Sequence, residues 1–449
     1  MSPSACKTIQ VVSVVCSLSL SQLAQDVKEL EEQIVEIVNQ AGREFYGKVF
    51  ALFQERWLAE RAEQYRAQRW RAINQGTPFG LVRLPVRVVR SRSDGHYLTL
   101  SRLFGPKATR LLSPLIEKRA LEAATGENYR PAGAELWRWL RVKVSAWLVW
   151  RCVQFHGAKL SAQLDRQWWP DRAEPRPAQV VVTEIDSTYL KRQQRDRPAK
   201  KTTTHFPMHL GMHYSGRQRR YQKRGSSSVR LQNKRWILSS QGLAILGRRL
   251  PWQRMRHFAR SAPQIILSDG DEGLKWLREK EFAHAQWLLD RWHIAQNVPT
   301  LVGEDQAEHR RIMNAVWKAN SEAVLEALRT SAYRQSRPME FNALFGYLLG
   351  NREGIDNWRN IPLRLRRSLG RKIAPVRAGS GAIEKNIEVR INRRFKRQGR
   401  GWTRRGAEHL AQLLWLQTHP TDWSHWWNKT ALTKTKLNPG WPSSAPPTN

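Results

Sequence analysis

The sequence contains few cysteines, few acidic residues and no long hydrophobic run. Its three cysteines, Cys6, Cys16 and Cys152, are spread over 449 residues and form neither a CxxC pair nor a zinc-ligand spacing. This argues against a disulfide framework and favours a reducing compartment such as the cytoplasm. No apolar stretch reaches the roughly 20 residues that a membrane helix needs, so we expect no membrane-spanning segment.

Acidic residues are half as common as basic ones. The chain has 76 Lys and Arg against 38 Asp and Glu, a formal net charge of +38. Such an excess attracts polyanions, because counterions released from phosphates would supply much of the affinity. Anionic lipid is the alternative, but it usually recruits one short polybasic run beside an apolar anchor. Basic residues here recur from about residue 56 to beyond residue 405. We therefore expect nucleic acid as the partner.

The N-terminal part is predicted to be mainly helical. Residues 1–20 are an extension of unassigned role, whose apolar segment lacks a signal-peptide cleavage site. Between residues 23 and 53 apolar residues recur at steps of three and four, which predicts a helix with one apolar stripe. That stripe either packs on its own domain or forms a dimerising coiled coil. We assign 21–170 to DNA binding or dimerisation.

The same part also contains a hairpin signal. Residues 79–102 alternate apolar with basic or polar side chains around Asp94-Gly95, which predicts a β-hairpin. Helical patterns follow from 108 to 164. A proline-rich linker at 170–177 then marks a domain boundary.

After this linker, strand and helix signals alternate. β-branched and apolar runs predict strands at 179–186, 206–214, 236–239, 264–270 and 285–290. Helices are expected at 243–258 and 273–281, and the basic stretches 191–201 and 217–235 read as exposed loops. Residues 294–370 show helical periodicity without any strand signal.

Three acidic residues stand out because of where they fall. Asp186 and Asp269 each end a predicted strand, and Glu384 lies in the first turn of a helix opened by GSGAIEKN (379–386). Mg²⁺ prefers a few carboxylate oxygens and otherwise keeps water or takes phosphate oxygens. Two such ions about 4 Å apart can activate an attacking hydroxyl and stabilise a leaving one at a phosphodiester. The three acids would suit that chemistry if their elements meet.

Each acid also has a purely structural explanation. Asp186 could cap a turn with the Ser-Thr that follows it, and Asp269-Gly270 is a common turn dipeptide. Glu384 gains stability from the positive end of its helix dipole. Only the combined order of strand-Asp, strand-Asp and helix-Glu, in so basic a chain, makes catalysis the better interpretation.

The helix that begins near Glu384 is predicted to have one apolar and one basic side. On an ideal helix wheel Ile387, Ile391 and Phe395 lie within about 60° of Glu384, while Asn386 and the arginines lie opposite. Between Arg390 and Arg405 there are eight basic residues and no acidic one. A run of one sign repels itself unless an anion neutralises it, so we expect phosphate contacts. The candidate DNA-binding residues are Arg390, Arg393, Arg397, Arg400, Trp402, Arg404 and Arg405.

Four segments resemble, in order and spacing, the DDE transposases of bacterial insertion sequences, in particular the ISLre-type group, which is distantly similar to Mutator-like elements. They are EIDSTYL (184–190), SDGDEGLKW (268–276), LLDRWHIAQN (288–297) and GSGAIEKNIEVRINRRFKRQGRGW (379–402). The resemblance covers about residues 20–420. It implies an α/β fold with a ribonuclease-H-like mixed-sheet core (171–293 and 373–420), an all-helical insertion (294–372) and a flexible tail (421–449).

The resemblance also implies an activity, namely metal-dependent DNA cleavage and strand transfer. Carried over by motif, the catalytic and metal-binding residues are Asp186, Asp269 and Glu384, with Mg²⁺ as cofactor and Mn²⁺ as its substitute. The accessory candidates are Glu184, Asp271 and His293. Asp290 and His293 stand where Mutator-like relatives have a Cys-x-x-His pair, and we read His293 as structural rather than metal-binding.

The partners implied by the resemblance are double-stranded DNA, as element ends and as target, and further copies of the chain in a homodimer or larger oligomer. The site of action would be the bacterial nucleoid in the cytoplasm. Two alternatives stay open: a catalytically inactive, transposase-derived DNA-binding protein, and a ribonuclease-H-like nuclease without strand transfer. Terminal inverted repeats beside the gene would favour the transposase over both.

Overall fold

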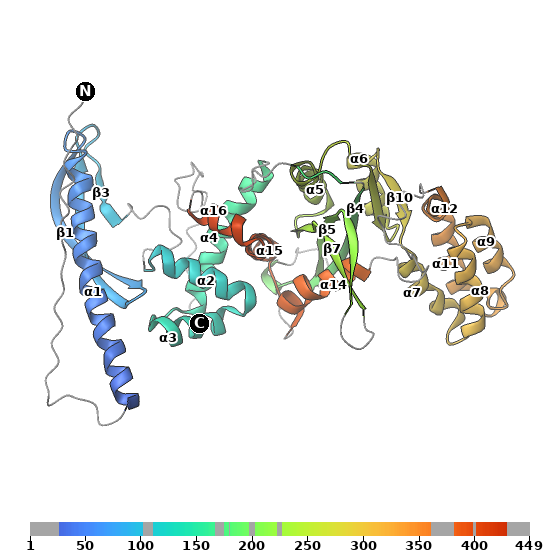
Figure 1. Cartoon of the computed structure of the whole chain (residues 1–449), viewed down its shortest axis with the longest axis horizontal. Helices are drawn as coiled ribbons and strands as arrows, with labels where there is room; N and C mark the ends of the chain where they lie inside the picture. The colour runs from blue at the N-terminus through green and yellow to red at the C-terminus, as the bar shows by residue number, and fades with distance from the viewer. Residues whose placement is uncertain are drawn as a thin grey trace. The chain divides into compact units, whose positions relative to one another are not determined.

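The computed structural model describes residues 27–101, 111–166, 175–178, 180–196, 203–221, 227–360, 381–397 and 401–428. The chain forms two compact units, one made of Met1–His156 with Thr421–Asn449, the other of Gly157–Pro420. Figure 1 shows the elements of each unit. Among the helices in the described ranges, none is both long and apolar enough to cross a membrane.

The first unit contains a long helix, α1 (Val27–Ala59), beside a three-stranded antiparallel sheet. The strands are β1 (Tyr65–Thr77), β2 (Gly80–Ser91) and β3 (Tyr97–Thr99), in the order β1-β2-β3. The predicted hairpin is confirmed, because β2 and β3 pair on either side of Asp94-Gly95. Strand β1 was not expected, since its sequence has few apolar residues and most of its side chains are exposed.

Alternation along β2 explains how the sheet meets α1. Val82, Leu84 and Val86 face inward and pack with Phe50 of the helix. Buried Gln54 adds polar contacts, because its Nε2 donates to the carbonyl of Pro85 (2.9 Å) and its Oε1 accepts from the Arg87 amide (2.8 Å). Burial of a paired amide at this position fixes the helix along the strand.

Four more helices belong wholly or partly to this unit: α2 (Pro114–Gly126), α3 (Tyr129–Leu140), the first half of α4 (Ala146–Asp165) and α16 (Pro420–Trp426). Buried His156 and Glu117 bond to each other at 2.8 Å. Trp423, Trp426 and Trp427, at the start of the segment expected to be a tail, are buried here.

The second unit is built on a five-stranded mixed sheet. Its strands are β4 (Val181–Lys191), β5 (His205–Tyr214), β8 (Arg235–Ser239), β9 (Gln264–Ser268) and β10 (Gln286–Leu289). The order is β10-β9-β4-β5-β8. Strands β4, β9 and β10 are parallel, β5 is antiparallel to β4, and β8 is antiparallel to β5. All five predicted strands are present, and the predicted fold class is confirmed.

One loop prediction was wrong. The stretch 217–235 contains a two-stranded antiparallel ribbon of β6 (Gly216–Tyr221) and β7 (Ser227–Gln232) before it reaches β8. Its sequence is mostly basic and polar, and its longest apolar alternation, Val229 and Leu231, is too short to signal a half-buried strand.

Helices cover the sheet. They are α5 (Leu243–His257), α6 (Glu272–Glu281) and α15 (Arg404–Gln417). Buried Glu408 of α15 accepts hydrogen bonds from the guanidinium of Arg249 on α5 and from the amide of Ser240 after β8. Arg249 also bonds Asp165 at the end of α4 (2.7 Å). One buried ionic network thus joins three helices.

Between β10 and the last core elements lies an all-helical segment. Its helices are α7 (Arg291–Val302), α8 (Gln306–Trp317), α9 (Ser321–Arg329), α10 (Tyr333–Ser336), α11 (Pro338–Gly350) and α12 (Arg352–Asn360). Figure 1 shows them gathered beyond β10. Trp358 of α12 donates to the carbonyl of Leu289 (2.8 Å) and Asn357 to that of Trp287 (2.9 Å). The insertion therefore covers the open edge of the sheet.

Candidate active site

The parallel strands place three aspartates in one row. Asp186 lies on β4, two residues after Glu184, which pairs with Leu267 of β9. Asp269 is two residues after Leu267, so it stands at the same level on the neighbouring strand. Asp290 directly follows the last residue of β10, which pairs with the last residue of β9. Neighbouring strands lie about 4.8 Å apart, so the row brings these carboxylates to one edge of the sheet.

Glu184 fixes the helix that carries Glu384. This side chain is fully buried, its Oε1 accepts from the Tyr214 hydroxyl (2.6 Å) and its Oε2 from the amide of Ile383 (3.0 Å). Ile383 is in α14 (Gly381–Ile387), whose first turn also contains Glu384. The two bonds attach the helix start to β4, so we assign Glu184 a positioning role.

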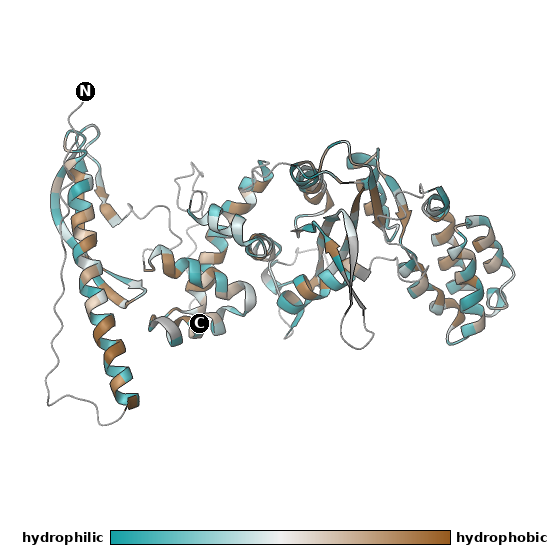
Figure 2. Ribbon diagram, in the orientation of Figure 1, coloured by the Kyte–Doolittle hydropathy of each residue, from teal (hydrophilic) through white to brown (hydrophobic). Residues whose placement is uncertain are grey.

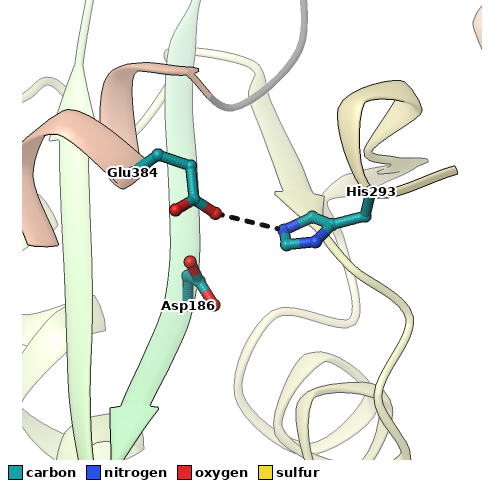
Figure 3. A group of neighbouring side chains, drawn as sticks. All are labelled: Asp186, His293 and Glu384. Atoms are coloured by element: carbon teal, nitrogen blue, oxygen red, sulfur yellow. Dashed lines mark ion pairs between the residues drawn. The ribbon is translucent and has the colours of Figure 1, made fainter. Parts of the chain in front are cut away.

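Three side chains from three elements converge at this point. Ligand atoms of Asp186, His293 and Glu384 all lie within 4.8 Å of one another. Figure 3 shows the carboxylates of Asp186 and Glu384 turned toward each other and the His293 ring pointing at Glu384. His293 Nε2 is 3.5 Å from Glu384 Oε1 and 3.6 Å from Asp290 Oδ2. His293 and Asp290 are one helical turn apart at the start of α7.

Crowding of acids changes their protonation. Burial, reinforced by the charge of Glu384, raises the pKa of Asp186 from 3.8 to about 7, although the Ser187 amide donates to Asp186 Oδ1 at 2.6 Å. Burial also raises the pKa of Glu384, and the carboxylates of Asp290 and Asp269 add to that effect. A buried acid cluster with raised pKa values is one that a nearby positive charge would stabilise.

Asp269 stands beside the group of three rather than in it. It is half-buried, and burial raises its pKa. Its Oδ1 accepts from the Asp271 amide (3.0 Å), and its carbonyl accepts from the hydroxyl of Tyr347 in α11 (2.6 Å). Gly270 has φ +80, the left-handed conformation that favours glycine, which turns the chain into α6. Asp271 is exposed and caps α6 through the Gly273 amide (2.8 Å).

The residues fit a divalent cation. Mg²⁺ holds its ligands at about 2.0–2.1 Å, so two ligand atoms on one ion lie roughly 3–4 Å apart. Small side-chain rotations would bring atoms that now lie within 4.8 Å to that separation. Two carboxylates and a nearby third suit Mg²⁺ or Mn²⁺, since both ions prefer carboxylate and water oxygens.

The basic residues after Glu384 differ in their surroundings. Helix α14 continues as a π-helix over Glu388–Lys396. Arg393 in this helix and Arg397 just after it are exposed, and each lies 3.8 Å from Glu388. Arg405 is exposed, and Arg400 lies outside the described residues. Arg390 and Arg404 are half-buried, with their guanidinium groups over the rings of Trp236 and Phe206, respectively.

Two polar or aromatic side chains in this segment face inward. Trp402 is buried, and its indole donates to the carbonyl of Phe395 (2.8 Å), so its ring packs in the core. Asn386 is also buried, and its Oδ1 accepts from Lys234 (3.0 Å). The helix wheel had put it on the basic side. Ile387, Ile391 and Phe395 are buried as the wheel predicts.

The structure places two further residues beside the acids: Asp290, to which the sequence analysis gave no catalytic or metal-binding role, and Tyr347, which it did not name. Asp290 is fully buried and caps α7 by accepting from the Trp292 amide (3.0 Å). Its position directly after a strand, like that of Asp269, was the available signal. Tyr347 had no signal, because it reaches Asp269 from the middle of the insertion, 78 residues later in the chain.

Comparison with known proteins shows the family of this chain. A relative from Streptococcus gallolyticus, described as UPF0236 protein in vanSb 3'region, is 23% identical over 406 residues, covering 88% of this chain and 83% of the relative. A solved structure, the Drosophila P element transposase strand transfer complex, is similar over 71% of this chain and 81% of its own, at 8% identity and a TM-score of 0.23, which adds nothing to the fold described above. The model of the Uncharacterised protein family UPF0236 matches residues 22–430, and the chain belongs to that family.

Proposed function

We propose that this protein is a DDE-type transposase of the ISLre-type group, which cleaves DNA at the ends of an insertion sequence and joins them to target DNA. The observation that carries the proposal is the meeting of Asp186 and Glu384 within the group that includes His293. Asp269 stands on the adjacent strand at the level of Asp186. The net charge of +38 supports a polyanionic substrate.

The reaction would proceed by two displacements at phosphorus. In the first, water attacks a phosphodiester and a 3′ oxygen leaves with a proton. In the second, this 3′ hydroxyl attacks a phosphodiester of the target, so one bond forms as one breaks. Asp186, Asp269 and Glu384 would hold Mg²⁺, or Mn²⁺ in its place, which supplies positive charge where negative charge develops.

Other residues of the chain would support this site. Glu184 keeps the start of α14 against β4 and thereby holds Glu384 beside Asp186. His293, whose Nε2 lies 3.5 Å from Glu384 Oε1, would help to keep the Glu384 carboxylate in place at the site. The exposed Arg393, Arg397 and Arg405 would contact the phosphate backbone.

The test is cleavage of a duplex that carries the element's own end, in Mg²⁺ or Mn²⁺, by the wild type and by Glu384→Gln. We expect the variant to lose at least about a hundredfold in cleavage rate while it still binds the duplex. The matched control is Glu388→Gln, one turn further along, because Glu388 is half-exposed and lies outside the acid group. It should cut like the wild type.

The other outcomes would contradict the proposal in different ways. Cleaved ends that never join to a target plasmid would identify a nuclease on the same fold. Duplex binding without any cleavage would identify an inactive, transposase-derived DNA-binding protein. Equal cleavage by wild type and Glu384→Gln would remove Glu384 from the catalytic group.

A further inference from the structure

Helix α1 has apolar side chains on two opposite faces. The face toward the hairpin contains buried Phe50 and Gln54. Counted at about 100° per residue, these two lie about 140° and 180° around the helix from Val27. The sheet therefore accounts for one face only, and the face around Val27 is left open in the described part of the first unit.

The open face carries a continuous row of apolar residues, here named the α1 stripe. Its members lie within about 60° of Val27 on the helix wheel. All except the alanine are exposed, Val27 to 73% and Val38 to 57%. Figure 2 shows hydrophobic residues recurring along the whole of α1. The α1 stripe is Val27, Leu30, Ile34, Val38, Ala41, Phe45, Val49 and Leu52.

The first half of α1 extends beyond the sheet. The turn between β1 and β2 meets the helix at Gly42, where an added Cβ would be 2.2 Å from the ring of Phe79. No residue from Val27 to Gly42 is buried. A helix of this length is marginal in water on its own. Packing along the α1 stripe would stabilise it.

The spacing of the α1 stripe reads the same from both ends. Its successive steps are 3, 4, 4, 3, 4, 4 and 3 residues. In an antiparallel pair of such helices, each stripe residue would meet one of similar character, and the residue numbers of every pair add up to 79. The pairs are Val27 with Leu52, Leu30 with Val49, Ile34 with Phe45 and Val38 with Ala41. A two-fold axis between residues 39 and 40 makes this arrangement self-complementary.

Charges along the helix favour the antiparallel direction. Residues 27–40 contain four acidic residues and one basic residue, whereas residues 41–59 contain two acidic and three basic residues. Parallel pairing would place the two acidic halves together. Antiparallel pairing places each acidic half beside a basic one.

We propose that the α1 stripe binds the α1 stripe of a second copy of this chain, antiparallel and centred between residues 39 and 40. Small Ala41 near the axis lets the two helices approach closely at the centre. The overlapping 26 residues span about 39 Å of helix. The proposal rests on α1 alone and stands whether or not the protein is a transposase.

The first test is the mass of the full chain by light scattering at micromolar concentration. The wild type should have twice the chain mass of 52.2 kDa. In the proposed dimer Ile34 of each chain meets Phe45 of the other. Ile34→Lys with Phe45→Lys therefore places two positive charges at each of these two contacts and should weaken dimerisation at least about a hundredfold. Gln40→Lys with Glu44→Lys, exposed and on a different side of α1, should stay dimeric. A monomeric wild type, or an Ile34/Phe45 variant that dimerises like the wild type, overturns the proposal.

The second test fixes the direction. In a background with Cys6 and Cys16 changed to serine, Leu30→Cys and Val49→Cys are made in two chains of different size, mixed and oxidised. Antiparallel pairing predicts a disulfide between the two variants and none between identical chains. Disulfides between identical chains mean a parallel pair, and no disulfide between chains means that another segment covers the α1 stripe. Either result overturns the proposal.

Discussion

Asp186 is a buried carboxyl whose charge works against folding when no cation is bound. Its pKa in the folded protein, about 7, lies above the ordinary 3.8. The folded state therefore binds this proton more tightly than the unfolded state, and its contribution is present at low pH and lost as pH rises toward 7. Asp186→Asn has no carboxyl to ionise at this position, so it should not lose this stability as pH rises.

The corresponding experiment is urea unfolding from pH 4 to pH 8 in chelator. We expect the wild type to lose up to a few kcal/mol relative to Asp186→Asn over this range, since one pKa unit corresponds to about 1.4 kcal/mol. Added Mn²⁺ should stabilise the wild type at pH 8 and leave the variant unchanged. Parallel pH profiles for the two proteins would show that Asp186 is not strained by its neighbours.

Asp269 and Asp271 are alike in sequence and differ in the structure. Asp269 stands in the row with Asp186, while Asp271 is exposed and caps a helix. We expect Asp269→Asn to lower DNA cleavage at least about a hundredfold with little change in duplex affinity. Asp271→Asn should keep most of the cleavage rate and most of the stability, because the Asn side-chain oxygen can still accept from the Gly273 amide and cap α6. The reverse ranking of cleavage rates would move the second metal position to Asp271.

Helices α4, α5 and α15 depend on one buried guanidinium. Arg249 is about 1% exposed and is held by fully buried Glu408 and by Asp165, whose side chain is 41% exposed. Glu408→Gln leaves the buried positive charge with the partly exposed Asp165 and the neutral Ser161 hydroxyl (2.9 Å), so we expect a loss of about 3 kcal/mol in the free energy of unfolding. Asp165→Asn, on the same arginine, should cost less than about 1 kcal/mol. Equal losses would mean that the network acts as one unit.

Sequence patterns could predict elements that contain apolar runs and failed where such runs were absent. The five core strands were predictable because apolar runs such as QIIL before Asp269 or QWLL before Asp290 mark a central sheet. The exposed strand β1 and the β6–β7 ribbon have no such runs. The helix wheel failed at Asn386 because it considered α14 alone and could not know that Lys234 reaches over from the start of β8.

The candidate site was predictable in part for a similar reason. Asp186, Asp269 and Glu384 follow strand ends and a helix start, which are local signals. The roles of Glu184 and Tyr347 depend on partners far along the chain, at Ile383 and Asp269. No local pattern encodes such contacts.

At the scale of the whole molecule, the net charge of +38 predicts strong salt dependence of DNA binding. With six to ten phosphate contacts, affinity should fall by about 10³ to 10⁵ between 50 and 200 mM salt. Arg393→Gln with Arg397→Gln should lower the slope of log affinity against log salt by about 2 and weaken all duplexes alike. An unchanged slope would remove this segment from the DNA interface.

The bond between Glu184 and the amide of Ile383 joins residues 199 positions apart. It gives the site an order of assembly. A chain emerging from the ribosome has β4, β9 and β10, and with them the row of aspartates, well before α14 is synthesised. Glu184 and Asp186 then lack their last neighbours, so the acid cluster closes only when nearly the whole protein exists. If the proposed function holds, an incomplete translation product would keep most of the basic residues but would have no complete acid cluster with which to cut DNA.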